Sequence, residues 1–233
     1  MSGIDSLERE YAAPAAYSIQ TVQPYYWHKG QSEADAPLYF YLLFDQSADQ
    51  IETYEALKAV LCVGSGPIRS ATRYPAHVAP LLIPVGETKI SLARPNPTEN
   101  QVGDFMRDNY DKLQAADVMG RAGLPLHHVY LVATTVPSRV WSTGMGVLHP
   151  SVFRAARIDD AGDNIGAALQ SLIGEAMDGT IFSGPTVRDR GYVVISWVEQ
   201  LGGVVLSVGA SLVPGQAQAS ELKTTDRGVC APS

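Results

Sequence analysis

The sequence predicts an α+β fold, with α/β as the alternative, and three observations support that prediction. Residues 38–44 form a continuous apolar and aromatic run of seven, as expected for a strand that is buried on both faces. Two amphipathic helical stripes follow, one beginning near Ala48 and one near Thr98. A β-branched and aromatic run at 127–135 closes the series, so strands and helices alternate over residues 36–137.

The order of these elements predicts a particular architecture. The glycines of 64–67 end the first helical pattern, and a weak strand at 68–74 follows. Residues 78–85 form a short strand, whose Pro80 and Pro84 favour an edge or a bulge. This order favours a ferredoxin-like split strand-helix-strand unit, with two helices on one face of an antiparallel sheet; a three-layer parallel sheet is the competing arrangement.

The second helix of the unit has a defined start and end. Thr98 and Gln101 have capping-box spacing, and Gly120 or Gly123 ends the helix. The apolar residues of its stripe are Val102, Phe105, Met106, Leu113, Ala116 and Met119. The spacing therefore predicts a single long helix from Thr98 onward.

Residues beyond 137 extend the unit by a helix at 163–177 and a C-terminal β-hairpin at 192–213. The stretch 192–213 is apolar enough to require comparison with a membrane span. Its Glu199 and its glycine pair disfavour a spanning helix, so the hairpin is preferred and no membrane span is expected. We expect one globular domain over 36–213 and a flexible tail over 214–233.

Residues 1–35 are polar and irregular, yet they hold five of the chain's aromatic side chains. Disordered tails are usually poor in aromatic residues, so we interpret this segment as an extended arm that docks on a surface. That surface is either the arm's own domain or a partner. Because Tyr and Trp are enriched among interface anchors, the expected partner-binding residues are Tyr17, Tyr25, Tyr26 and Trp27.

Charge and cysteine content restrict the possible partners and compartments. The chain has 17 Lys and Arg against 24 Asp and Glu, a formal net charge of −7 that disfavours broad binding to nucleic acid or anionic lipid. Cys62 and Cys230 do not form a disulfide framework, and residues 1–10 lack the apolar core of a signal peptide. We therefore expect a cytoplasmic protein that binds no nucleic acid.

The loop 64–73 is the most suggestive candidate for binding an anion. Its glycines would let backbone amides approach a ligand, and its two arginines could each hold a carboxylate or a phosphate. The candidate anion-binding residues are Gly64, Ser65, Gly66, Arg69 and Arg73. The alternative is a helix cap beside two solvated arginines, because the glycines follow a helix and match neither a Walker loop nor a dinucleotide fingerprint.

Signals for catalysis and for metal binding are weak. Asp45 follows a central strand, which is a frequent place for a functional carboxylate and also for a helix cap. His127 and His128 begin a strand and point to opposite faces, so no metal site and no cofactor are expected. The catalytic residues, if any exist, are not identified by any motif.

These observations favour a non-catalytic subunit or adaptor of a multiprotein assembly, which binds partner protein or further copies of itself through the aromatic arm. Two alternatives stay open, both using Asp45 and the 64–73 loop. One is a hydrolase or transferase without a recognisable motif. The other is a sensor that binds a nucleotide or another anion.

Overall fold

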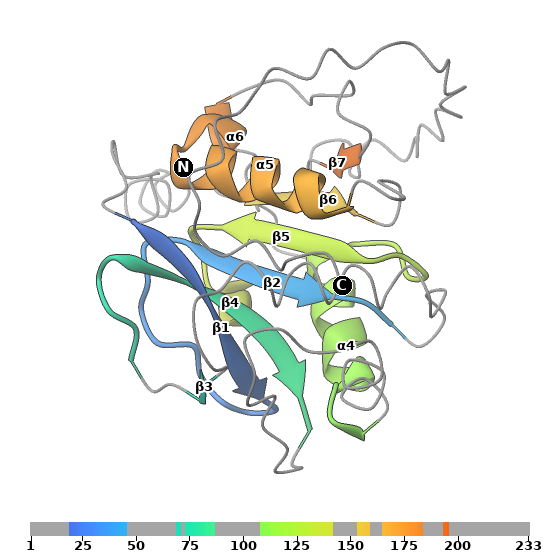
Figure 1. Cartoon of the computed structure of the whole chain (residues 1–233). Helices are drawn as coiled ribbons and strands as arrows, with labels where there is room; N and C mark the ends of the chain where they lie inside the picture. The colour runs from blue at the N-terminus through green and yellow to red at the C-terminus, as the bar shows by residue number, and fades with distance from the viewer. Residues whose placement is uncertain are drawn as a thin grey trace, which may run out of the picture.

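The computed structural model of the chain describes residues 19–45, 69–70, 73–86, 108–141, 153–158, 165–183 and 193–195. These residues form one seven-stranded sheet with helices beside it (Figure 1), so the fold is α+β. The strands are β1 (Thr21–His28), β2 (Tyr39–Leu43), β3 (Arg69–Ser70), β4 (Val78–Val85), β5 (Tyr130–Thr134), β6 (Phe153–Arg157) and β7 (Val193–Ile195). The helices are α4 (Lys112–Ala122), α5 (Ile165–Met177), α6 (Thr180–Ser183) and the 3-10 helix η1 (Ser138–Val140).

The sheet is mixed, with strand order β3-β1-β4-β2-β5-β6-β7. Strands β3, β1, β4 and β2 run parallel to one another, whereas β2, β5, β6 and β7 pair antiparallel. The parallel pairing of β2 with β4 makes the sheet mixed, whereas the sequence predicted an antiparallel sheet over 36–137. Helix α4 contacts β2 and β4, while α5 and α6 contact β5 and β6 (Figure 1).

Strand β2 lies in the interior of the sheet, as its apolar run predicts. It is flanked by β4 and β5, and all five of its residues are at most 2% exposed. A strand with neighbours on both sides and cover on both faces has no position for a charged side chain. The continuous apolar pattern of 38–44 thus has a direct structural cause.

Strand β4 corrects the expectation that its prolines place it at an edge. It lies between β1 and β2, and all eight of its residues are buried. The Pro84 carbonyl accepts a hydrogen bond from Asp111 N at 3.1 Å, and Val85 forms an isolated bridge with Tyr110. On the side away from β1, β4 pairs with β2 through two residues only. Few N–H groups of β4 are needed as donors in so short a ladder, so prolines are tolerated in this inner strand.

Strand β1 corrects the prediction of an arm for the part of residues 1–35 that the structure describes. It lies between β3 and β4 and pairs with β4 through eight residues, from Thr21 opposite Val78 to His28 opposite Val85. Residues 21–28 therefore belong to the same sheet as residues 39–43. Of the two docking surfaces considered for the aromatic segment, residues 21–28 use their own sheet.

Helix α4 corrects the prediction of one long helix from Thr98. The helix begins after Asp111, whose carboxylate accepts a hydrogen bond from Gln114 N at 2.9 Å, and residues 98–107 lie outside the described residues. The break at Tyr110 has a physical reason, because its hydroxyl donates to Leu42 O at 3.0 Å and accepts from Phe44 N at 3.1 Å. Gly123, at φ +67°, ends the helix in the left-handed conformation that glycine favours.

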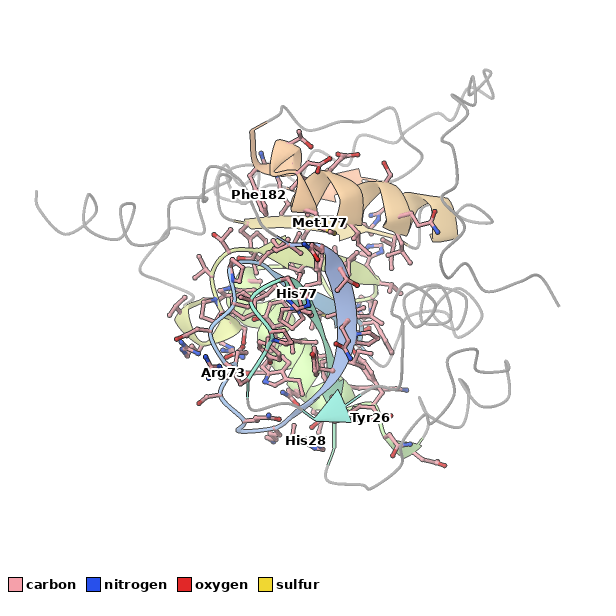
Figure 2. The ribbon with its side chains drawn as sticks, turned by 60° about the vertical axis from the view of Figure 1, so that its left-hand side comes forward. Tyr26, His28, Arg73, His77, Met177 and Phe182 are labelled. Carbon is pink, nitrogen blue, oxygen red and sulfur yellow. The ribbon has the colours of Figure 1, made fainter. Side chains whose placement is uncertain are left out.

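The remaining predictions for the C-terminal half are met in part. The helix expected at 163–177 is α5, and β7 falls within the first strand of the expected hairpin. Residues 196–213, the tail after 213 and the first helix near Ala48 lie outside the described residues. Across the described ranges, no helix is both long and apolar enough to cross a membrane. In Figure 2, His77 lies near the start of the paired strands β1 and β4 and His28 at their end.

Candidate functional site

A groove of about 500 Å³ lies where three segments of the described chain meet. The first is the turn that follows β1, the second is one face of α4, and the third is η1. Each segment contributes at least one cationic side chain: Lys29, Arg121 and Arg139, respectively. The groove therefore gathers charges that are far apart in the sequence.

The turn after β1 is fixed by its own hydrogen bonds. Gln31 N donates to His28 O at 2.9 Å, and Gln31 Oε1 accepts from His28 N at 3.2 Å. The Trp27 indole N–H donates to Gln31 O at 3.0 Å, which holds the buried indole against the groove. Gly30 takes the positive φ of +78° that the turn requires, and Lys29 is exposed beside it.

Helix α4 contributes one face to the groove. Gln114, Asp117 and Arg121 are spaced by three and four residues and so lie along the same side of the helix. Leu113 lies beside them with 70% of its surface exposed. The Gln114 amide oxygen is buried and has no hydrogen-bond partner among the described residues.

The buried carboxylate of Glu33 joins the turn to η1. Its side chain is 2% exposed, and Oε1 accepts hydrogen bonds from Ser138 N at 3.1 Å, from the Ser138 hydroxyl and from the Tyr41 hydroxyl at 3.3 Å. Ser138 is the first residue of η1, and its N–H also donates to the Tyr41 hydroxyl at 3.0 Å, so both side chains supply acceptors to this helix start. Burial, and next the Glu33 charge, raise the pKa of Tyr41 well above its usual value, so its hydroxyl stays protonated.

The two arginines of the groove are held in the same way. Arg121 Nη1 donates to Ser138 O at 3.0 Å, and Arg139 Nη1 donates to Glu33 O at 2.6 Å. Each guanidinium also contacts a carboxylate of an exposed aspartate: Arg121 Nε lies 3.2 Å from Asp117, and Arg139 Nη2 lies 3.4 Å from Asp35. Backbone carbonyls thus orient both guanidinium groups before any ligand arrives.

The charges at the groove are balanced. Three cations of the lining face the lining carboxylates of Glu33 and Asp117 and the Asp35 carboxylate, which contacts Arg139. Glu33 Oε2 also lies 3.9 Å from Arg139 Nη1. Asp117 is 71% exposed, and within the described ranges it forms an ion pair with Arg121 of the same helix. An acidic ligand could therefore reach the two arginines only by replacing the exposed carboxylates of Asp35 and Asp117.

The structure separates the aromatic residues that the sequence grouped as partner-binding. Tyr25 and Tyr26 are 4% and 9% exposed in β1, and the Tyr25 ring packs against Tyr74 at 4.9 Å between centroids. Trp27 is 5% exposed and is the one member of the group that lines the groove. Tyr17 lies outside the described residues. Tyr25 and Tyr26 therefore serve the protein's own core.

The predicted anion-binding loop is described only in part. Gly64, Ser65 and Gly66 lie outside the described residues, and Arg69 falls in β3 opposite Tyr25. Arg73 is exposed in the connection to β4 (Figure 2) and does not line the groove. The loop as a binding site stays a prediction.

Asp45 acquires a neighbour that the sequence did not indicate. Its carboxylate is 10% exposed and lies 3.7 Å from Nδ1 of His127, whose side chain is 70% exposed. Asp45 follows β2 and His127 precedes β5, and the antiparallel pairing of these strands brings the two together. His127 has φ +72°, a conformation in which His is enriched among non-glycine residues. A carboxylate beside an imidazole can move a proton, but the pair by itself does not define a reaction.

Several residues of the groove carried no signal in the sequence. Glu33 and Ser138 are separated by 105 residues, and nothing local to either predicts their contact. Arg121 and Arg139 belong to different elements and look like ordinary surface cations. The groove arises only because β2 and β5 pair and bring the end of β5 to the connection before β2.

Comparison with known proteins adds no relative to this picture. No protein-family model, no curated protein and no solved structure matches the chain. Within the residues the structure covers, no group of three or more His, Cys, Asp or Glu is placed to hold a metal ion.

Proposed function

We propose that this protein is a non-catalytic subunit or adaptor that docks an acidic segment of a partner protein in the groove. The observation that carries the proposal is the anchoring of Arg121 and Arg139 on the backbone carbonyls of Ser138 and Glu33. Side chains that are ordered before binding lose less conformational entropy when a ligand arrives. Two ordered guanidinium groups in one groove are suited to carboxylates.

The exposure of the rim favours a protein segment over a small molecule. Small-molecule sites bury about 70 to 90% of the ligand's surface. Here Arg139 is 46% exposed and Leu113 is 70% exposed, so the groove has an open rim. An extended segment of a larger protein can lie across such a rim and cover Leu113 with an apolar side chain of its own.

Of the aromatic residues that the sequence predicted to bind a partner, this proposal retains Trp27 alone. It places the partner-binding surface at the groove instead of on an N-terminal arm. Trp27 contributes to the groove wall, whereas Tyr25 and Tyr26 belong to the core. A cytoplasmic location and assembly with copies of itself remain part of the same proposal, supported by the acidic composition and by the two isolated cysteines.

The finer architectural prediction also remains a proposal. The neighbours β5, β2 and β4, with β2 and β4 parallel and β5 antiparallel to β2, are compatible with three strands of a ferredoxin-like split unit. In that interpretation β1 is an additional strand that lies beside β4.

The test compares partners bound by the parent chain and by a variant in which Arg121 and Arg139 are both replaced by Gln. Proteins that co-purify with the parent from its own cells are identified, and those lost in the variant are purified and titrated against both chains. We expect at least about a tenfold loss of affinity, because two charge-assisted contacts are removed. The loss should shrink at high salt, since the attraction is electrostatic.

Two further variants keep this test decisive. Arg73→Gln with Lys112→Gln removes the same charge outside the groove lining and should retain the partner. Leu113→Asp changes an exposed side chain that cannot unfold the core, yet it should also weaken binding. A folded double-arginine variant that keeps every partner at parental affinity would overturn the proposal. A loss caused by the control variant instead would direct attention to the 64–73 loop.

The contact between Asp45 and His127 supports a second candidate, a hydrolase or transferase that uses this pair for proton transfer. Asp45→Asn would remove the carboxylate beside the His127 imidazole and should lower the rate on an ester or phosphate ester substrate. Equal turnover by the parent and the variant, or none by either, would remove this candidate.

A further inference from the structure

Two exposed aspartates form ion pairs with the groove arginines, as the carboxylates of an acidic ligand would. Asp35 is 98% exposed and lies 3.4 Å from Arg139 Nη2, and Asp117 is 71% exposed and lies 3.2 Å from Arg121 Nε. The Arg121 contact is an ion pair without hydrogen-bond geometry. Neither aspartate accepts a bond from a buried group of the described chain, whereas both arginines do donate to buried carbonyls.

The two ends of each arginine therefore differ in their role. The inner nitrogen of each guanidinium is fixed to the backbone, at Ser138 O or at Glu33 O. The second contact of each guanidinium is with an exposed carboxylate, made by Nη2 in Arg139 and by Nε, which is buried beneath the Asp117 contact, in Arg121. Pairs with exposed carboxylates contribute little to stability. Exchange of the outer carboxylate thus leaves the inner anchor intact and demands no rearrangement of the fold.

We propose that Asp35 and Asp117 are internal competitors for the groove, and that the docked segment carries two carboxylates that replace them on Arg139 and Arg121. This inference rests on the proposed function and adds the chemistry of the partner. Both guanidinium groups are anchored around Ser138, directly for Arg121 and through Glu33 for Arg139, so the two carboxylates must lie close together in the segment. An apolar side chain near them would cover Leu113.

Removal of a competitor should tighten binding, which is the opposite of what removal of a ligand contact does. Asp35→Asn and Asp117→Asn keep the size and shape of each side chain but cancel the negative charge. We expect each change to raise the affinity for an acidic segment about two- to fivefold, in proportion to the strength of an exposed ion pair. The double variant should bind more tightly than either single variant, and its departure from the product of the two effects measures the coupling of the arginines through Ser138 and Glu33.

The experiment uses a fluorescein-labelled peptide Glu-Glu-Leu-Glu-Glu, with Gln-Gln-Leu-Gln-Gln as the neutral peptide, and the full-length chain. Fluorescence polarisation gives the affinity, and the indole N–H signal of Trp27 in NMR spectra reports whether the groove is occupied. Asp178→Asn is the matched control, because it cancels an exposed carboxylate at the end of α5 without lining the groove. Citrate, added at the same concentration of carboxylate groups as the peptide, tests whether a small anion displaces the labelled peptide equally well.

The outcomes separate this inference from the proposal on which it rests. Tighter binding in both groove variants, with parental affinity in Asp178→Asn, supports the competitor role. If the parent binds the acidic peptide and the double-arginine variant does not, but Asp35→Asn and Asp117→Asn leave the affinity unchanged or weaken it, the competitor role is wrong and the docking function stands. Absence of peptide binding in every chain, or equal displacement by citrate, would overturn the docking of an acidic segment together with the inference.

Discussion

At the scale of the residue, Glu33 contributes both to the stability of the fold and to the geometry of the groove. It accepts hydrogen bonds from Ser138 and Tyr41, and its backbone carbonyl orients Arg139. We expect Glu33→Ala to lower the free energy of unfolding by about 3 kcal/mol, because several donors lose a charged acceptor. Glu33→Gln keeps one acceptor oxygen and should cost about half as much. Urea denaturation of the three chains measures both values, and equal stability of all three would show that the carboxylate is dispensable.

A second residue-scale prediction concerns buried tyrosines at high pH. Burial raises the pKa of Tyr39 to about 12 and the pKa of Tyr41 and Tyr110 well above the usual value. The folded state therefore keeps protons that the unfolded state loses above about pH 10, and stability falls as the pH rises from about 10 to about 12. Each tyrosine contributes a slope of up to about 1.4 kcal/mol per pH unit in this window. Denaturation at several alkaline pH values checks the slope, and Tyr39→Phe should make it shallower.

At the scale of the element, helix α4 depends on the cap that begins it. The Asp111 carboxylate accepts a hydrogen bond from Gln114 N, and the helix then carries Gln114, Asp117 and Arg121 into the groove. We expect Asp111→Ala to cost about 1 kcal/mol of stability and to weaken binding of an acidic segment, because the first turn would fray. Asp111→Asn retains the capping oxygen and should behave nearly as the parent. A capping defect that spares binding would show that the groove does not depend on this turn.

The elements also show what the sequence can and cannot predict. The run at 38–44 and the stripe at 163–177 report burial directly, and both elements formed where expected. The break at Tyr110 escaped prediction because its causes are distant contacts, namely the hydroxyl bonds to Leu42 and Phe44 and the bridge to Val85. Strand β1 escaped because parallel pairing with β4 depends on residues more than fifty positions away. The groove was unpredictable for the same reason, since its charges meet only after the sheet has formed.

At the scale of the whole molecule, the position of β1 changes the expected effect of truncation. Deletion of residues 1–30 removes a strand that lies between β3 and β4 and buries Tyr25, Tyr26 and Trp27. The truncated chain should fail to fold, because loss of β1 leaves eight positions of β4 without their partners and exposes apolar surface. Deletion of residues 1–18 retains β1 and serves as the control. Circular dichroism and thermal melting distinguish the two, and a folded 31–233 chain would contradict the placement of β1.

During protein synthesis, β1 is made well before β4, the strand with which it pairs. Residue Thr21 leaves the ribosome about 57 residues before Val78, its partner in the sheet. At roughly 5 to 20 residues per second, β1 waits about 3 to 11 seconds before β4 has been made. During that interval an aromatic segment is exposed to solvent without its neighbour and is available to chaperones and to aggregation. Slower translation through residues 78–85 should therefore lengthen the vulnerable period and lower the yield of folded protein.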